Sequence, residues 1–218
     1  MIVTIDGPAG SGKSTISKML AKELGATFLD TGAMYRAVTL AAIADDIDLA
    51  DEDALFGVLE SKQFEFNTHD NQMEVKINGI DATEGIRRPD ITINVKYIAK
   101  AAKIRKKLVD MQRKFAKKHD KIVTEGRDQG TIAFPNADYK FFLIADVEER
   151  ARRRHAEFTE KGLNIDLDVL EKDIRKRDES DTTRKNGPLI KAGGAIEIDS
   201  TKLDAEAVVK KILQHINP

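Results

Sequence analysis

The stretch that decides the fold stands at the start of the sequence: Ile2-Val-Thr-Ile-Asp6-Gly7-Pro8-Ala9-Gly10-Ser11-Gly12-Lys13-Ser14-Thr15. Residues 7–14 match the pattern Gly-x-x-x-x-Gly-Lys-[Ser/Thr] in full. A short apolar run typical of a buried strand precedes the pattern. An amphipathic segment from Lys13 to Leu24 follows it, with Gly25 placed to end a helix. This strand–loop–helix context predicts a phosphate-binding loop.

Each residue type in this loop has a chemical reason. Glycines let backbone N–H groups turn inward around a polyphosphate, and the positive amino end of the following helix adds to the attraction. Lys13 supplies a cation for the β- and γ-phosphate oxygens, and the Ser14 hydroxyl is a ligand for Mg²⁺. The alternatives are a glycine-rich turn without a ligand, and a dinucleotide fingerprint, which needs Gly or Ala where Thr15 stands. We therefore expect the following residues to bind a nucleoside triphosphate with Mg²⁺: Gly7, Pro8, Ala9, Gly10, Ser11, Gly12, Lys13, Ser14 and Thr15.

Short apolar runs continue to alternate with helical patterns along the rest of the chain. This order is typical of βαβ units and predicts an α/β fold with a parallel sheet of five strands flanked by helices. The further strands are expected at Thr27–Leu29, Lys121–Thr124, Tyr139–Ala145 and Ala195–Ile198, and the further helices at about Ala33–Ala44, Val147–Lys161 and Ala205–Ile216.

Three segments depart from this alternation. Phe64–Phe66 and Met73–Ile77 alternate with period two around a turn-prone stretch, which predicts a small antiparallel ribbon. Leu163–Ala192 is highly charged and is expected to be an exposed helical excursion or a mobile lid. Lys96–Lys121 carries eleven Lys and Arg, which suggests RNA binding. Its apolar residues nevertheless repeat at helical spacing from Tyr97 to Phe115, which favours a solvated amphipathic helix.

Composition excludes several classes of protein. The 218 residues suffice for one α/β domain and are few for two. A net charge of -1 argues against a dedicated nucleic-acid-binding protein. The chain has no cysteine, which rules out disulfides and thiolate metal sites, and its four histidines lack ligand spacing. No signal-peptide pattern or apolar run of membrane-spanning length is found, so we expect a cytoplasmic protein without a membrane partner.

The use of the nucleotide can be narrowed by elimination. A GTPase should carry Asn-Lys-x-Asp, which is missing from the sequence. Motor and helicase ATPases are generally much larger than this chain. Small phosphotransferases remain, and these need a second pocket for an acceptor and cationic groups around the transferred phosphoryl group.

Four further motifs could form that pocket. In chain order they are Asp30-Thr-Gly-Ala-Met-Tyr-Arg36, Glu125-Gly-Arg127-Asp128-Gln-Gly-Thr131, Glu149-Arg150-Ala-Arg-Arg-Arg154 and Arg177-Asp178-Glu-Ser-Asp181-Thr-Thr-Arg184. This ordered set resembles the bacterial cytidylate kinase family over nearly the whole chain. The resemblance implies a P-loop nucleoside monophosphate kinase fold with an acceptor-binding insert and a helical lid. It also implies ATP-dependent phosphorylation of CMP and dCMP to CDP and dCDP in pyrimidine nucleotide metabolism.

The resemblance also divides the chain and assigns residues to roles. One kinase domain spans residues 1–218, with a core at 1–30, 90–160 and 193–218, the insert at about 31–89 and the lid at about 161–192. The protein is expected to be a monomer. Lys13, Arg127 and Arg177 are the expected catalytic residues. The acceptor nucleotide would be bound by Thr31, Arg36, Arg105, Arg127, Asp128, Arg177, Asp181 and Arg184.

Two positions depart from the family pattern. Lys96 stands where the family has a small hydroxyl residue at the base, and Thr83-Glu84-Gly-Ile-Arg87 replaces a Gly-Glu-Ile-Arg sequence. We therefore assign no site role to Lys96 or Glu84.

Physical chemistry supports the use of arginines in this reaction. A nucleoside monophosphate is mostly dianionic at pH 7, since its second pKa is about 6, and it needs no general base. The enzyme must instead cancel charge between two anions, for which the planar guanidinium fork is suited. Arg150 and Arg154 lie four residues apart and are either phosphate contacts or a solvated face. Glu125 and Asp146 are both candidates for the outer coordination sphere of Mg²⁺; family position favours Glu125.

Overall fold

The computed structural model describes residues 1–160 and 162–216. Its main sheet has five parallel strands in the order β2-β6-β1-β7-β8. The predicted α/β fold is therefore confirmed; the first strand has the predicted bounds, and the bounds of the other four are shifted by one or two residues. The strands are β1 (Ile2–Asp6), β2 (Thr27–Asp30), β6 (Ile122–Gly126), β7 (Tyr139–Ile144) and β8 (Ile196–Asp199).

Helices cover both faces of this sheet. The helices are α1 (Lys13–Leu24), α2 (Thr31–Ala44), α3 (Glu52–Ser61), α4 (Pro89–Lys100), α5 (Ala102–Ala116), α6 (Val147–Glu160), α7 (Leu167–Thr183) and α8 (Ala205–Ile216). The end of the helix expected at Val147–Lys161 falls on Lys161, which lies outside the described residues.

Alternating side chains of the strands build two hydrophobic clusters. Val3 and Ile5 of β1 are fully buried in one cluster, together with apolar residues of α1 and α8. Leu29 of β2 and Ile122 of β6 belong to the other, which also contains residues of α2 and α5. Because strand side chains alternate between the two faces, one short apolar run supplies both clusters. The sheet is thereby packed between helices through an apolar cluster on each face.

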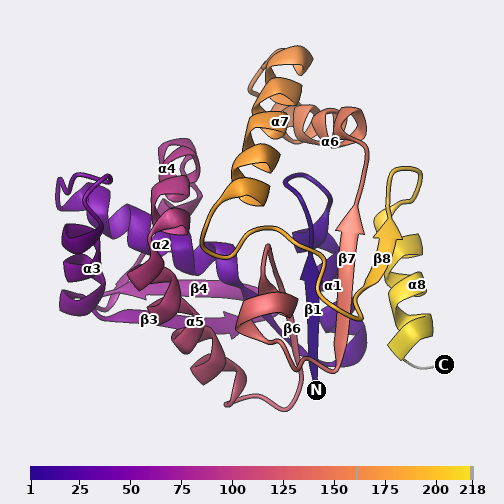
Figure 1. The fold of residues 1–218 in the computed structure, drawn as a ribbon, viewed down its shortest axis with the longest axis horizontal. Coiled ribbons are helices and arrows are strands. Elements are labelled where there is room, and N and C mark those ends of the chain that lie inside the picture. The colour runs from indigo at the N-terminus through magenta and orange to yellow at the C-terminus, as the bar shows by residue number, and fades with distance from the viewer. Residues whose placement is uncertain (161, 217–218) are drawn as a thin grey trace.

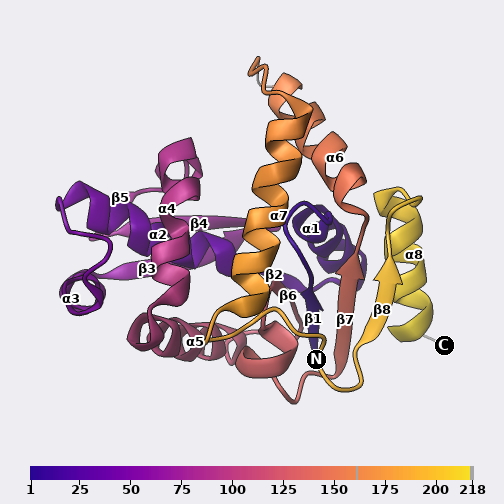
Figure 2. The ribbon, with the colours of Figure 1, turned by 45° about the horizontal axis from the view of Figure 1, so that its top comes forward.

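The carboxyl ends of the parallel strands point to one end of the molecule. Figure 1 shows α6 and α7 standing above the carboxyl ends of β1 and β7. In Figure 2, α7 stands between the side formed by α2 and α4 and the strands of the main sheet. Ligands of open α/β sheets bind outside the carboxyl ends of the strands. This end is therefore where a site is expected.

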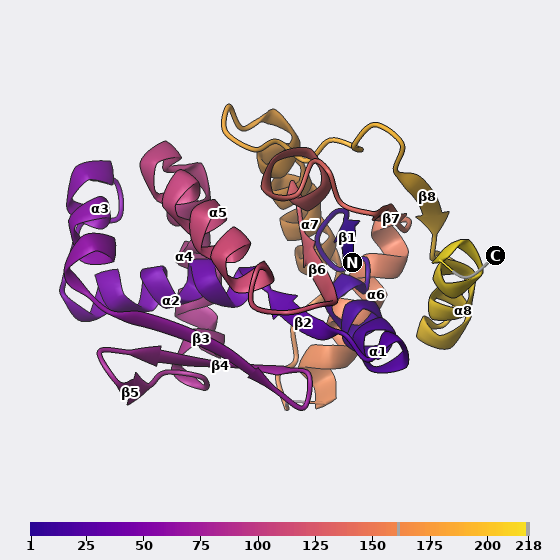
Figure 3. The same ribbon diagram turned by 90° about the horizontal axis from the view of Figure 1, so that it is seen from below.

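The predicted ribbon forms a separate antiparallel sheet, seen from below in Figure 3. It consists of β3 (Phe64–His69), β4 (Gln72–Ile77) and a short third strand, β5 (Ile80–Asp81), which the sequence did not predict. Asp70 and Asn71 connect β3 to β4 with φ of 49° and 56°, the geometry of a tight two-residue hairpin. The Thr68 hydroxyl donates to the Phe28 carbonyl at 2.9 Å and ties the ribbon to β2.

The expectation of one amphipathic helix over Lys96–Lys121 is wrong. Ala101 adopts an extended conformation (φ −69°, ψ 111°), so α4 ends at Lys100 and α5 begins at Ala102. The break changes which residues face the core, because Ile98 is fully buried while 38% of Tyr97 remains exposed. Of the stripe predicted from Tyr97 to Phe115, Tyr97 is therefore outside the core, whereas Ala101 at the break and Ile104, Leu108 and Phe115 of α5 are buried.

Three further elements had no counterpart in the sequence analysis. Helix α3 begins after Asp51, whose carboxylate accepts hydrogen bonds from the Asp53 and Ala54 N–H groups. After β6 the chain makes a π-helical turn, η2 (Gln129–Ala133), which has no periodic apolar pattern of its own. A short 3₁₀ turn, η1 (Gly85–Arg87), precedes α4. Among the described helices, none is both long and apolar enough to cross a membrane.

Candidate active site

A cleft of about 620 Å³ opens at the carboxyl end of the sheet. It runs from the phosphate loop in two directions, toward α2 and α5 on one side and toward α6 and the β8–α8 connection on the other. Most of the predicted site residues line this cleft: Gly10, Gly12, Lys13, Ser14, Thr15, Thr31, Arg36, Arg105, Glu125, Arg127, Asp128, Arg154, Arg177, Asp181 and Arg184.

The phosphate loop wraps around the amino end of α1. Gly12 precedes the helix with φ of 87°, a conformation that side chains disfavour. Gly7 approaches β7 so closely that a Cβ there would lie 2.1 Å from the Leu143 carbonyl oxygen. The buried Lys13 ammonium donates to the Pro8 carbonyl at 2.6 Å. Burial, and after it the charges of nearby arginines, lower the pKa of Lys13, which favours an anion beside it.

Arg36 and Thr31 reach the cleft from the first turns of α2. Asp30 caps this helix by accepting from the Ala33 N–H at 2.9 Å and also pairs with Arg36 at 3.2 Å. The Arg36 Nε is buried, and the described residues offer it no hydrogen-bond partner. A buried unpaired donor of a cation is costly, and an anionic ligand would satisfy it.

Asp128 and Arg105 form a buried ion pair at one end of the cleft. Asp128 follows β6, whereas Arg105 projects from α5 and also lies over the Tyr35 ring, 5.6 Å from its centroid. Burial raises the pKa of Tyr35 to about 12, so the phenol stays neutral. This end of the cleft therefore offers a carboxylate acceptor, guanidinium donors and an aromatic ring, a combination suited to a planar polar ligand.

Helix α7 contributes a second ion-pair cluster. The Asp181 carboxylate accepts from Arg127 at 2.7 Å and lies 3.4 Å from a nitrogen of Arg184. Burial opposes ionisation of Asp181, but Arg127 outweighs it and lowers the pKa of this carboxyl. Arg177 lines the cleft. Desolvation by surrounding protein atoms, followed by the charge of Arg127, lowers its pKa to about 10, so it remains a cation at neutral pH.

Ser14 and Glu125, the residues expected at Mg²⁺, offer a hydroxyl and a carboxylate oxygen. Both line the cleft, and hard oxygen ligands are those that Mg²⁺ prefers. Burial raises the pKa of Glu125, and Lys13 opposes that rise. The described residues contain no group of three or more His, Asp or Glu that could hold a metal by themselves, so phosphate oxygens would complete the coordination. The competing Asp146 is exposed and does not line the cleft.

Some expected residues lie elsewhere. Gly7, Pro8, Ala9 and Ser11 belong to the loop but do not line the cleft. Arg150 is buried and donates to the Ala9 and Ala145 carbonyls and to Asp178, so its guanidinium is directed to protein partners instead of a phosphate. Arg154 does face the cleft and stacks on Phe158. Lys96 and Glu84 are exposed outside it.

Two features of the site were not predicted from the sequence. The first is Asp6, a buried carboxylate at the end of β1 that does not line the cleft itself but accepts from the Gln129 and Gly130 N–H groups behind it. Its place at the end of a buried strand was the available signal. The second is the far end of the cleft, which no motif marks because its residues are ordinary loop and helix residues: Arg153, Ser200, Leu203, Asp204, Ala205 and Val208.

Comparisons with known proteins agree with this geometry. Residues 3–218 match the family model described as Cytidylate kinase. A cytidylate kinase of Lactobacillus gasseri is 46% identical over 216 residues, which cover 99% of this chain and 94% of the relative. One of Oceanobacillus iheyensis is 46% identical over 98% of this chain and 93% of the relative.

Solved structures extend the likeness to the fold. A shikimate kinase of Bacteroides thetaiotaomicron superposes with a TM-score of 0.52 at 13% identity, covering 100% of this chain and 99% of that one. The protein TT1252 of Thermus thermophilus superposes with a TM-score of 0.51 at 16% identity, covering 100% and 98%. At these identities the likeness concerns the fold alone.

Proposed function

The chain belongs to the cytidylate kinase family, and from this premise we propose that it transfers the γ-phosphoryl group of ATP to CMP and dCMP. The observation that carries the proposal is one cleft that is lined both by Lys13 of the phosphate loop and by Arg36 and Arg127 of the acceptor side. Two anionic substrates brought together there would meet cations from several elements. Charge cancellation between two anions is the main task of such a catalyst.

The phosphate chemistry needs positioning more than proton transfer. The acceptor phosphate is already a dianion at neutral pH, so it attacks the γ-phosphorus in line without a general base. Mg²⁺, held through Ser14 and with Glu125 in its outer sphere, would neutralise charge on the β- and γ-phosphates. Lys13, Arg127 and Arg177 would carry the charge that develops between the two nucleotides.

The acceptor nucleotide would lie on the side of α2 and α5. Arg36 and Arg127 would hold its phosphate, and the unpaired Arg36 Nε supports this assignment. Thr31, whose hydroxyl donates to the Glu125 carbonyl at 2.8 Å, lies beside them. Arg177 and Asp181 would reach the pentose, with Arg184 near the base. The nucleoside of ATP would then occupy the end of the cleft formed by α6 and the β8–α8 connection.

The Arg105–Asp128 pair would read the base. Cytosine presents an amine donor beside N3 and O2 acceptors, whereas uracil presents a carbonyl and a protonated N3. The Asp128 carboxylate suits the amine, and the Arg105 fork suits the acceptors. Uracil would set a carbonyl oxygen against a carboxylate, and a site built for one hydrogen-bonding group rejects an analogue lacking it by about 10⁴–10⁵ at best.

The same proposal divides the chain into working parts. The core would comprise residues 1–30, 90–160 and 193–216 of the described chain, and the insert about 31–89 would carry Thr31 and Arg36. The lid would be about 162–192 and would carry Arg177, Asp181 and Arg184 on α7 and the turn after it. The separation of the lid from the sheet is supported by the contacts of α7, which among the described residues packs chiefly on α6 and at most slightly on the strands.

An acceptor panel tests the proposed function. ADP release from ATP should be measured with CMP, dCMP, UMP, AMP and shikimate. We expect CMP and dCMP to be the preferred acceptors. A preference for AMP or shikimate would contradict the proposal, as would ATP hydrolysis that no acceptor accelerates and that accompanies salt-sensitive RNA binding.

Replacing Asp128 tests the base-reading assignment. We expect Asp128→Ala to lower kcat/KM for CMP and to reduce the preference for CMP over UMP by at least about tenfold, because the hydrogen bond that distinguishes the bases is lost. The KM for ATP should remain nearly unchanged. Asp110→Ala is the matched control, since Asp110 is an exposed aspartate on α5. A variant that keeps the full preference for CMP would show that Asp128 does not read the base.

A further inference from the structure

Asp6 is a buried carboxylate with an unusual set of partners. It ends β1 and is 2% exposed. Its two oxygens accept from the Gln129 N–H at 2.8 Å and from the Gly130 N–H at 2.7 Å. The partners lie more than 120 residues away in the sequence and follow Arg127 and Asp128 directly. A single side chain thus joins the strand that enters the phosphate loop to the turn that carries two proposed acceptor contacts.

The turn needs such a partner. The first N–H groups of a helical turn have no acceptor within it, and Asp128, the residue before η2, makes no side-chain cap. Asp6 supplies this cap from the neighbouring strand. The Asp128 carboxylate is consequently free to pair with Arg105. A cap from Asp128 itself would turn that carboxylate away from the cleft.

Holding a charge at this position is unfavourable for the fold. Burial raises the pKa of Asp6 to about 6, and the facing charges are Asp128, which adds to the rise, and Lys13, which opposes it. The two backbone hydrogen bonds reduce the shift but do not cancel it. A neutral side chain could accept one of these bonds without the desolvation cost. The ionised carboxylate, which accepts both at once, therefore points to a functional demand on the turn.

We propose that Asp6 is a positioning residue, which fixes residues 127–130 so that Arg127 and Asp128 present their side chains to the acceptor nucleotide. The inference rests on the proposed acceptor site. Gly7 of the phosphate loop follows Asp6 directly, so the side chain that holds the acceptor turn is attached to the donor loop. Asp6 would therefore also fix the distance between the donor and acceptor phosphate sites.

The test is Asp6→Asn, compared with Ile5→Val in the same strand. An asparagine has one acceptor oxygen and turns an NH₂ group toward the second N–H, so the turn loses one charge-assisted hydrogen bond. We expect KM for CMP to rise about tenfold or more and the preference for CMP over UMP to fall, with KM for ATP changed less than about twofold. Ile5 is fully buried, so the loss of one methylene in Ile5→Val should lower the melting temperature but leave both KM values unchanged.

Gly130→Ala perturbs the same contact from the turn instead of the strand. It replaces Asp6→Asn as the test if that variant does not fold. A Cβ at Gly130 would lie 3.3 Å from an Asp6 carboxylate oxygen and 3.1 Å from the Thr4 hydroxyl, so the carboxylate must shift by a few tenths of an ångström. We expect the same rise in KM for CMP alone. Where both variants fold, their effects should be less than additive in the double variant, because both act on one contact.

The outcomes separate this inference from the proposed function. If wild type prefers CMP while Asp6→Asn or Gly130→Ala keeps its KM for CMP and its preference, the positioning role is wrong. Equal rises in KM for ATP and CMP would likewise overturn it, because they indicate general damage. A wild type that does not prefer CMP contradicts the proposed function before any variant is considered.

Discussion

At the scale of single residues, the arginines of this protein divide by what their guanidinium groups contact. Arg150 of α6 donates to two backbone carbonyls and to Asp178, and so connects α6 to α7 and to the phosphate loop. Arg36 keeps a buried Nε without a partner among the described residues, and Arg177 faces the cleft. In the sequence all three are arginines within motifs. Only the hydrogen-bond partners distinguish an arginine that holds the fold from one that can hold a phosphate.

Lys13 gives the sharpest prediction at this scale. Removing its ammonium should lower kcat by about 10²–10³, the scale of losing one preorganised electrostatic contact to developing charge. The fold should survive, because among the described residues the nitrogen donates hydrogen bonds only to its own loop, at Pro8 and Ser11. Steady-state kinetics of Lys13→Ala, with circular dichroism to verify folding, checks this expectation.

The control for Lys13→Ala is Lys22→Ala, which removes an exposed lysine from the last turn of the same helix. Its kcat should match that of wild type. A folded Lys13→Ala enzyme that retains more than about half of the wild-type kcat would refute the assigned role.

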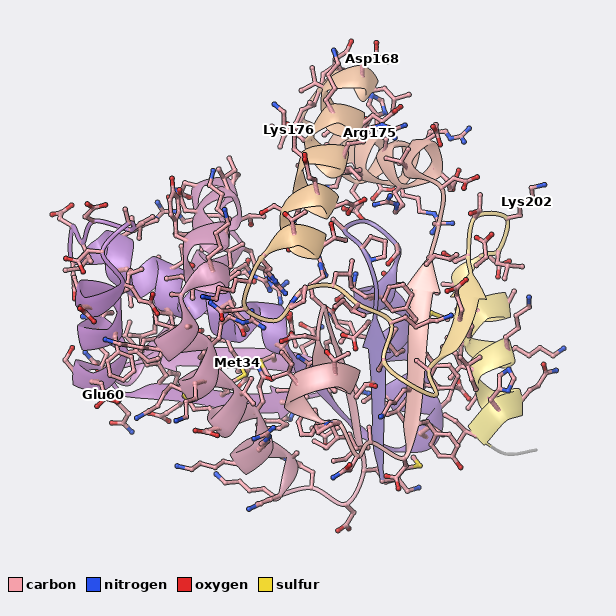
Figure 4. The ribbon with its side chains drawn as sticks, in the orientation of Figure 1. Met34, Glu60, Asp168, Arg175, Lys176 and Lys202 are labelled. Carbon is pink, nitrogen blue, oxygen red and sulfur yellow. The ribbon has the colours of Figure 1, made fainter. Side chains whose placement is uncertain are left out.

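At the scale of elements, α7 has few apolar anchors and many ionic ones. Leu170 and Ile174 are its buried apolar residues, and it packs chiefly on α6. Figure 4 shows Asp168 and Lys176 on the part of α7 that projects away from the sheet. Nearer the sheet, Asp178 pairs with Arg150 and Asp181 pairs with Arg127. An element held mainly by polar contacts opens at low free energy, which suits a lid.

Hydrogen exchange should reveal this behaviour. We expect the amides of Leu167–Thr183 to exchange faster than those of α1 in the free enzyme. They should be protected when ATP and CMP analogues are both bound, because arginines on α7 would then contact two anions. The amides of α3, none of whose residues line the cleft, serve as the control that should not respond to the nucleotides. Equal exchange of α7 in the free and doubly bound states would instead identify a static excursion.

Elements differed in how far the sequence could predict them. The five strands and the phosphate loop were predicted because buried apolar runs and glycine spacing are local signals. The break at Ala101 was not, since alanine favours helix and only packing of Ile98 and Ile104 in the core explains the change of direction. The π-helical turn at Gln129–Ala133 was also missed, because its cap, Asp6, is distant in sequence. Long-range hydrogen bonds leave no periodic pattern.

At the scale of the whole molecule, the two halves of the cleft meet at the centre of the sheet. Strand β1 lies between β6 and β7, and the phosphate loop and the acceptor turn emerge from neighbouring strands β1 and β6. From the sequence, the site residues were grouped by the order of their motifs and the family resemblance; in the fold they gather because the carboxyl ends of parallel strands share one edge. The contact between Asp6 and the acceptor turn could be recognised only from the register of β1 and β6, in which Asp6 lies opposite Gly126. The same carboxylate is therefore expected to affect both the acceptor site and the stability of the fold.

The pH dependence of stability should carry the signature of Asp6. Its pKa is about 6 in the folded protein against 3.8 as the ordinary value, so between pH 4 and pH 6 the native state binds more protons than the unfolded state. Stability from this group is therefore greatest at low pH and falls as pH rises through that window, by up to about 3 kcal/mol. Asp6→Asn lacks the titration. Carboxyls with the opposite sign, such as Asp181, contribute equally to both proteins and cancel in the comparison.

Urea unfolding of wild type and Asp6→Asn from pH 4 to pH 7.5 measures this difference. We expect the advantage of wild type over the variant to shrink steadily as pH rises and then to stay constant above about pH 7, where Asp6 is ionised in both states. At that plateau the variant should be as stable as wild type or more so, although it binds CMP less well. A difference that does not change with pH would show that Asp6 is not desolvated in the fold, and it would remove the argument that this charge is kept for function at the expense of stability.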